Sequence, residues 1–106
     1  MPDPATTAVV LRGEVDTEQT ELLASLAEDA LAAGRPVVLD VAGVTFMDST
    51  GAAFVAALVR GLGAGRVTVL RPSAQVRFLL EVTRLGTVVH VVTHPDGVPG
   101  DPPAPA

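Results

Sequence analysis

The sequence has 106 residues, the length of one ordinary domain, and 48% of them are hydrophobic, which is enough to build a core. The absence of cysteine excludes disulfide bonds, thiolate metal sites and a thiol nucleophile. The seven positive charges are arginines scattered along a chain of net charge −5. Because no basic patch is present, we expect neither nucleic acid nor a membrane as a partner.

The first residues, MPDPATT, lack the basic start and the apolar run of a signal peptide. The longest apolar stretch, residues 52–59, is far shorter than the roughly 20 residues that a membrane helix needs. We therefore expect a cytoplasmic protein. We divide it into an N-terminal arm at residues 1–7, one domain at residues 8–94 and a disordered, proline-rich tail at residues 95–106.

The first half of the domain predicts a strand, a helix and a second strand. Residues 8–16 open with β-branched apolar side chains, which is typical of a strand. Asp16 and Gln19 can then form a capping box at the start of a helix, which Gly34 ends. Residues 36–43 are apolar on both alternating faces except at Asp40, which favours a strand buried in a parallel sheet.

The second half continues the alternation. Residues 51–62 are helix-like, and residues 66–72 predict a strand. Ser73 can cap a third helix that Gly86 closes, and residues 88–92 predict the last strand. This order predicts an α/β fold: a single domain with a mainly parallel sheet of about four strands alternating with three or more helices.

The segment between the second strand and the second helix carries three polar residues, Asp48, Ser49 and Thr50, followed by Gly51. Sites in parallel sheets lie beyond the carboxyl ends of the strands, so this segment is the candidate site. One of the three side chains is expected to cap the helix by accepting hydrogen bonds from its first N–H groups. The other two would then be displayed at the edge of the sheet.

Two catalytic interpretations fit this segment poorly. Aspartic proteases use Asp-Ser-Gly or Asp-Thr-Gly in an all-β fold, whereas here an extra residue separates Asp48 from Gly51. The nucleophile elbow of serine hydrolases, Gly-x-Ser-x-Gly, would need glycine in place of Met47, and the candidate base, His90, lies in a valine-rich strand. We expect no enzyme, no catalytic residue, no cofactor and no metal. A small hydrolase that uses Ser49 or Asp48 is kept as an alternative hypothesis.

Modification of Ser49 is the stronger interpretation. A phosphoserine carries a charge of about −1.5 to −2, and the start of a helix tolerates that charge because its dipole and free N–H groups favour an anion. The same charge beside Asp48 would repel a docking partner. Phosphorylation could therefore switch binding off without unfolding the protein.

The segments that carry these features resemble a known family. GEVD, residues 13–16, follows a strand, and VVLDVAGVTFMDSTG, residues 37–51, joins a strand to a helix. With RPSAQVRFLLEVTRLG, residues 71–86, they are similar to the STAS domain, and within it to bacterial anti-sigma factor antagonists. The resemblance covers about residues 8–93, and residues 37–51 are its specific part.

The resemblance implies that Ser49 is phosphorylated by a cognate anti-sigma factor, itself a serine kinase of the GHKL type, and dephosphorylated by a PP2C-type phosphatase. The unphosphorylated protein would bind the anti-sigma factor and so free a sigma factor for transcription. Asp16, Asp48, Thr50 and Gly51 would belong to the partner-binding surface. Other STAS proteins are constitutive adaptor subunits of transporters or sensory complexes, and that alternative stays open.

Overall fold

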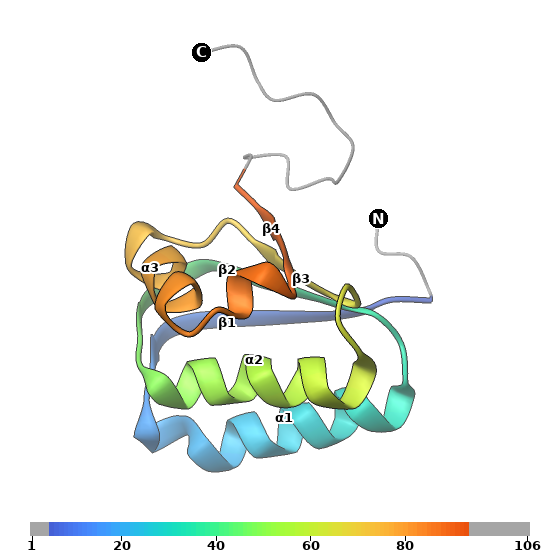
Figure 1. Ribbon diagram of the computed structural model, residues 1–106. Coiled ribbons are helices and arrows are strands. Elements are labelled where there is room, and N and C mark those ends of the chain that lie inside the picture. The colour runs from blue at the N-terminus through green and yellow to red at the C-terminus, as the bar shows by residue number, and fades with distance from the viewer. Residues whose placement is uncertain (1–4, 94–106) are drawn as a thin grey trace.

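The computed structural model describes residues 5–93 (Figure 1). The predicted tail at residues 95–106 lies outside these residues, as do residues 1–4 of the predicted arm. The elements in chain order are β1 (Thr7–Val15), the 3-10 turn η1 (Thr17–Gln19), α1 (Thr20–Ala33), β2 (Val37–Met47), α2 (Ser49–Leu62), β3 (Val67–Leu70), α3 (Ala74–Val82), the 3-10 turn η2 (Leu85–Thr87) and β4 (His90–Val92).

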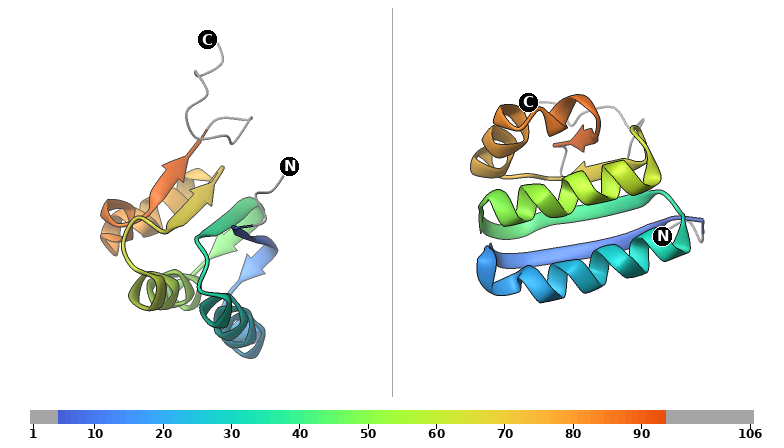
Figure 2. Two further views of the ribbon diagram at one scale, coloured as in Figure 1. Left: turned by 90° about the vertical axis from the view of Figure 1, so that its right-hand side faces the viewer. Right: turned by 60° about the horizontal axis from the view of Figure 1, so that its bottom comes forward.

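The four strands form one parallel sheet in the order β1-β2-β3-β4. Each helix connects a strand to its immediate neighbour, and all connections step in the same direction across the sheet. Because such crossovers are right-handed, the helices collect on one face (Figure 2, left). The predicted α/β class is confirmed, with a parallel sheet of four strands and three α-helices in the part of the chain that the structure describes.

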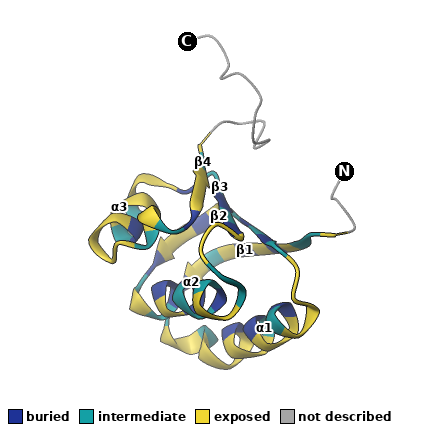
Figure 3. Ribbon diagram, turned by 45° about the vertical axis from the view of Figure 1, so that its right-hand side comes forward, coloured by how far each residue is buried: buried dark blue, intermediate teal, exposed yellow. Residues whose placement is uncertain are grey.

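The core lies between this sheet face and the helices (Figure 3). It is built almost entirely from aliphatic side chains, and within residues 5–93 no polar or charged residue is buried. Along β1 the buried and exposed positions alternate, which is the pattern of a strand covered on one side only. Leu58, in the second half of α2, is 0% exposed and anchors that helix on the sheet.

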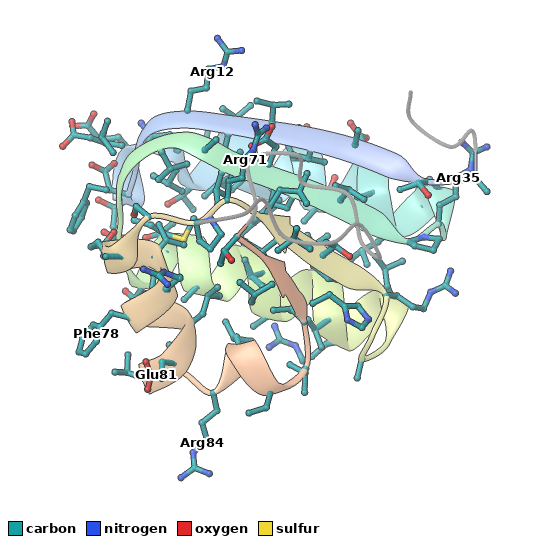
Figure 4. All side chains as sticks on the ribbon, turned by 90° about the horizontal axis from the view of Figure 1, so that it is seen from above. Arg12, Arg35, Arg71, Phe78, Glu81 and Arg84 are labelled. Atoms are coloured by element: carbon teal, nitrogen blue, oxygen red, sulfur yellow. The ribbon has the colours of Figure 1, made fainter. Side chains whose placement is uncertain are left out.

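Within residues 5–93 the other sheet face carries no helix, which corrects the expectation that the second strand is buried on both faces. Asp40 of β2 points to this open face, where it accepts a hydrogen bond from the Arg71 guanidinium at 2.6 Å. Figure 4 looks onto this face and shows Arg71 lying over β2. A polar residue inside an apolar strand therefore marks an open face here.

β2 is longer than predicted and continues to Met47 instead of ending at Gly43. Its pairing with β1 is irregular at two points, where β2 holds one residue more than β1. Bulges of this kind let a strand continue past a residue such as Gly43 that looks like a turn. As a result, Asp48 alone separates β2 from α2, and α2 begins at Ser49, two residues before the predicted start.

Two smaller differences concern the ends of the sheet. The last strand starts at His90 rather than Val88, because η2 occupies the preceding turn. β1 starts at Thr7, one residue inside the predicted arm. Within residues 5–93, none of the helices combines the length and the hydropathy that crossing a bilayer requires.

Candidate functional site

The candidate site is the joint between β2 and α2. The Asp48 carboxylate accepts a hydrogen bond from the Thr50 N–H at 2.8 Å. The Asp48 carbonyl accepts from the N–H groups of Gly51 and Ala52, at 3.0 and 3.2 Å. Asp48 is therefore the residue that caps α2, which settles which of the three polar residues does so.

Ser49 is the first residue of α2 and its side chain is exposed. Within residues 5–93 its hydroxyl makes no hydrogen bond, while the Asp48 carboxylate is engaged in the cap through the Thr50 N–H. The Thr50 hydroxyl makes no hydrogen bond in these residues either, but Thr50 is half-buried whereas Ser49 is exposed. The hydroxyl therefore lies free in solvent at the positive end of the α2 dipole. Such a group can accept a phosphoryl group without the loss of a native contact.

Gly51 lies beneath this surface and is buried. A Cβ atom at this position would overlap the side chain of Met47, which is itself almost fully buried. Glycine is thus needed because α2 passes very close to the last residue of β2. By allowing this close approach, Gly51 lets α2 start next to the end of β2, with Ser49 at the carboxyl end of the sheet.

Asp16 lies at the same end of the sheet, beyond the carboxyl ends of the strands. The residues that precede Asp16 and Asp48, Val15 and Met47, are paired in the sheet, and the Asp48 N–H donates to the Val15 carbonyl at 3.1 Å. Two carboxylates therefore flank the start of α2, one from each strand end.

The predicted capping box at Asp16 is confirmed. Its carboxylate accepts from the Glu18 N–H at 3.0 Å, and its own N–H donates to the Gln19 side-chain oxygen at 2.9 Å. The box opens η1, and the α-helix proper begins only at Thr20.

Sequence reasoning missed Gln75, in the first turn of α3. Its side-chain oxygen accepts from the Met47 N–H at 2.9 Å, and its amide nitrogen donates to the Met47 carbonyl at 2.6 Å. The amide thus pairs with Met47 as a neighbouring strand would, and ties the start of α3 to the residue before Asp48. Nothing in the local pattern of α3 signals this contact, since the partners are 28 residues apart.

Replacing Gln75 by alanine is expected to reduce the free energy of unfolding by about 1–3 kcal/mol, because both backbone groups of Met47 lose their partner in a partly buried place. Urea denaturation of the purified protein measures this loss. Gln75→Glu is the matched variant: it keeps the acceptor but turns the donor into a second acceptor facing the Met47 carbonyl. Gln75→Glu should therefore be destabilised as well. Full stability of either variant would contradict a stabilising role for the two Gln75–Met47 hydrogen bonds.

The sheet register separates Ser49 from His90. His90 pairs with Thr68, and Thr68 pairs with Val38, at the amino ends of the strands. Ser49 lies beyond the carboxyl end of β2, about 30 Å away at the rise per residue of a strand. A Ser49–His90 nucleophile and base is therefore excluded, and residues 5–93 hold no cluster of three side chains able to bind a metal.

Comparison with known proteins identifies the family of this fold. A family model described as "Mlab, STAS domain" matches residues 2–93. The unphosphorylated form of the anti-sigma factor antagonist SpoIIAA superposes with a TM-score of 0.66 at 24% identity, covering 87% of this chain and 83% of that one. The phosphorylated form of SpoIIAA, described as a Bacillus cell fate determinant, gives 0.67 at 24% identity, covering 91% and 90%.

A Thermotoga maritima protein, assigned provisionally as an anti-sigma factor antagonist, gives a TM-score of 0.68 at 15% identity, covering 89% of this chain and 84% of that one. At these identities the structures show a common fold, and no curated protein matches the chain significantly. The family match spans the whole described region, from β1 to β4. The chain therefore belongs to the STAS domain family.

Proposed function

We propose that this protein is an anti-sigma factor antagonist whose binding is switched off by phosphorylation of Ser49. The observation that carries the proposal is the free, exposed Ser49 hydroxyl at the start of α2, beside a carboxylate that is already committed to the cap. The structural likeness to SpoIIAA, solved in unphosphorylated and phosphorylated forms, supports the same assignment.

In this proposal the unphosphorylated protein binds a GHKL-type anti-sigma factor kinase and so releases a sigma factor. The kinase transfers the γ-phosphoryl group of ATP to Ser49: the Oγ–P bond forms, the bond to ADP breaks, and the hydroxyl proton leaves to a base of the kinase. A PP2C-type phosphatase hydrolyses the ester and returns the hydroxyl. The protein itself supplies the acceptor and catalyses neither step.

The docking surface in this proposal lies at the carboxyl end of the sheet. It carries Asp16, Asp48 and Thr50, with Gly51 beneath it. A phosphate at Ser49 adds about −1.5 to −2 charge next to Asp48. The α2 N-terminus can stabilise that charge in the free protein. A partner bound to the docking surface would have to remove water from the phosphate. Binding is lost while the fold is kept.

The experiment that tests the assignment is affinity capture from a lysate of the native host, with wild type, Ser49→Ala and Ser49→Asp as baits and partners identified by mass spectrometry. We expect a GHKL-type kinase on the first two baits and its loss from the third. A transporter ATPase or sensory scaffold retained equally by all three would overturn the proposal in favour of a constitutive adaptor.

A further inference from the structure

Two of the three phenylalanines are exposed. Phenylalanine supplies all the aromatic side chains of this chain, which has neither tryptophan nor tyrosine. Phe54 is buried in the core, whereas Phe46 of β2 is 43% exposed and Phe78 of α3 is 64% exposed. Aromatic side chains are enriched at protein–protein interfaces, where a few of them often carry much of the binding energy. The positions of Phe46 and Phe78 therefore indicate where a partner would bind.

A β-bulge turns Phe46 toward solvent. Gly13 of β1 pairs with Val44, whereas the next residue of β1 pairs with Phe46, so β2 holds one extra residue between these two pairs. Val44 is buried, and regular alternation would bury Phe46 as well and expose Met47. The extra residue reverses this order, because Met47 enters the core and Phe46 is exposed. The irregular pairing thus displays an aromatic ring at the end of β2.

α3 carries apolar residues on two faces. Val76 and Leu80 are buried in the core, about one turn apart. Phe78 and Val82 have the same spacing, but both are exposed. Two positions along a helix correspond to a rotation of about 200°, so this second pair lies on the side of α3 away from the core. Figure 4 shows the Phe78 side chain projecting outward from α3. Apolar side chains on both faces are typical of a helix that also binds a partner.

The Gln75–Met47 hydrogen bonds hold the two phenylalanines close to the candidate site. Phe46 directly precedes Met47 along β2. Phe78 follows Gln75 by three residues, which is less than one turn of α3. Because the Gln75 side chain bonds both backbone groups of Met47, at 2.9 and 2.6 Å, it fixes the start of α3 against the end of β2. Figure 4 shows Phe78 at the end of the molecule where β1 and β2 run into their helices, which is the end that carries Ser49.

We propose that Phe46 and Phe78 are the aromatic anchors for the partner that docks at Ser49, with each ring entering an apolar pocket on that partner. The assignment rests on the proposed function, since the anchors and the switch share one docking surface and one partner. It adds the residues that hold the partner, which the modification of Ser49 does not specify. Ser49 would then decide whether the partner binds, and the two rings would supply a large share of the binding energy.

Both rings are ready for binding in the free protein. They are exposed, and they stand on a strand and a helix that the Gln75–Met47 bonds tie together. A phenylalanine side chain has only two rotatable bonds, so its immobilisation costs less conformational entropy than that of a longer, flexible side chain. Burial of these rings against a partner therefore favours association without a rearrangement of this protein.

Titration calorimetry with the purified full chain tests the anchors. The titrant is the protein that the wild-type bait retains from host lysate, purified once it has been identified. We expect Phe78→Ala and Phe46→Thr each to raise Kd about tenfold or more, because truncation of an interface hot spot commonly costs this much affinity. Alanine suits a helix and threonine suits a strand, so circular dichroism and the melting temperature should change little.

Val10→Ala is the matched control. Val10 is also an exposed apolar residue, but it lies on β1 five residues before the end of that strand, away from the Gln75–Met47 bonds. This variant should bind the partner as wild type does. A loss of affinity that Val10→Ala shares equally would mean that exposed apolar area in general, and not the two rings, holds the partner, and would overturn the proposal.

Failure of the anchors and failure of the switch give different results. If Ser49→Asp binds as tightly as wild type while Phe78→Ala and Phe46→Thr bind weakly, the switch is wrong and the anchors stand. If Ser49→Asp loses the partner while both phenylalanine variants stay within about twofold of the wild-type Kd, the anchors are wrong and the switch stands. A wild-type bait that retains no protein lost by the double variant F46T/F78A would also overturn the anchors.

Discussion

Purified Ser49→Asp is expected to bind the proposed anti-sigma factor partner about a hundredfold more weakly than wild type, or worse. Like charges brought together at an interface cost several kcal/mol, and about 2.7 kcal/mol already corresponds to a hundredfold change in Kd. The carboxylate of the variant would lie beside Asp48, whose own carboxylate is fixed by the Thr50 N–H. Isothermal titration calorimetry with the purified partner measures the difference.

The free protein should tolerate the same change. An acid in the first turn of a helix interacts favourably with the dipole, by about 0.3–1 kcal/mol, so the melting temperature of Ser49→Asp should stay level or rise slightly. Ser49→Asn is the matched control because it has the size of aspartate without the charge. If Ser49→Asn lost as much affinity as Ser49→Asp, shape rather than charge would be decisive and the switch mechanism would be wrong.

Leu58→Ala is expected to reduce the free energy of unfolding by about 2–5 kcal/mol. Leu58 of α2 is 0% exposed and belongs to the core, so its truncation leaves a cavity that the surrounding core side chains fill only in part. For a domain of this size that is a large share of a total stability of about 5–15 kcal/mol. Denaturation in guanidinium chloride should show a lower midpoint at an unchanged slope.

Phe78→Ala on α3 is the comparison for this prediction. Phe78 is a larger side chain but is 64% exposed, and its truncation should change stability by about 0.5 kcal/mol or less. Equal losses for Leu58→Ala and Phe78→Ala would show that α2 is not anchored through Leu58, and the description of the core would need revision.

The alternation of strands and helices could be predicted because it follows from local periodicity and from glycines and caps. Asp16 with Gln19, Gly34 and Ser73 all mark helix ends at the residues where the structure has them or within a few positions. The extension of β2 to Met47 could not be predicted. The local sequence at Gly43 predicts a turn, and only the pairing with β1 reveals that the strand continues through bulges.

The candidate site was predictable in its residues but not in its assembly. The order Asp48, Ser49, Thr50 shows that a helix begins there, yet the choice of cap and the freedom of Ser49 depend on three-dimensional contacts. The Gln75–Met47 bonds and the Arg71–Asp40 ion pair join residues about thirty positions apart. Such pairs leave no period in the sequence, since each depends on where the crossovers bring the chain.

The strand order β1-β2-β3-β4 follows the order of synthesis. Each new strand pairs with the one made just before it, so every strand–helix unit leaving the ribosome finds its docking edge already in place. Each strand pairing closes a loop of one strand–helix unit, which is about the shortest separation that a parallel sheet permits. The nascent chain can therefore fold progressively from its N-terminus, with β1 as the template for the strands that follow.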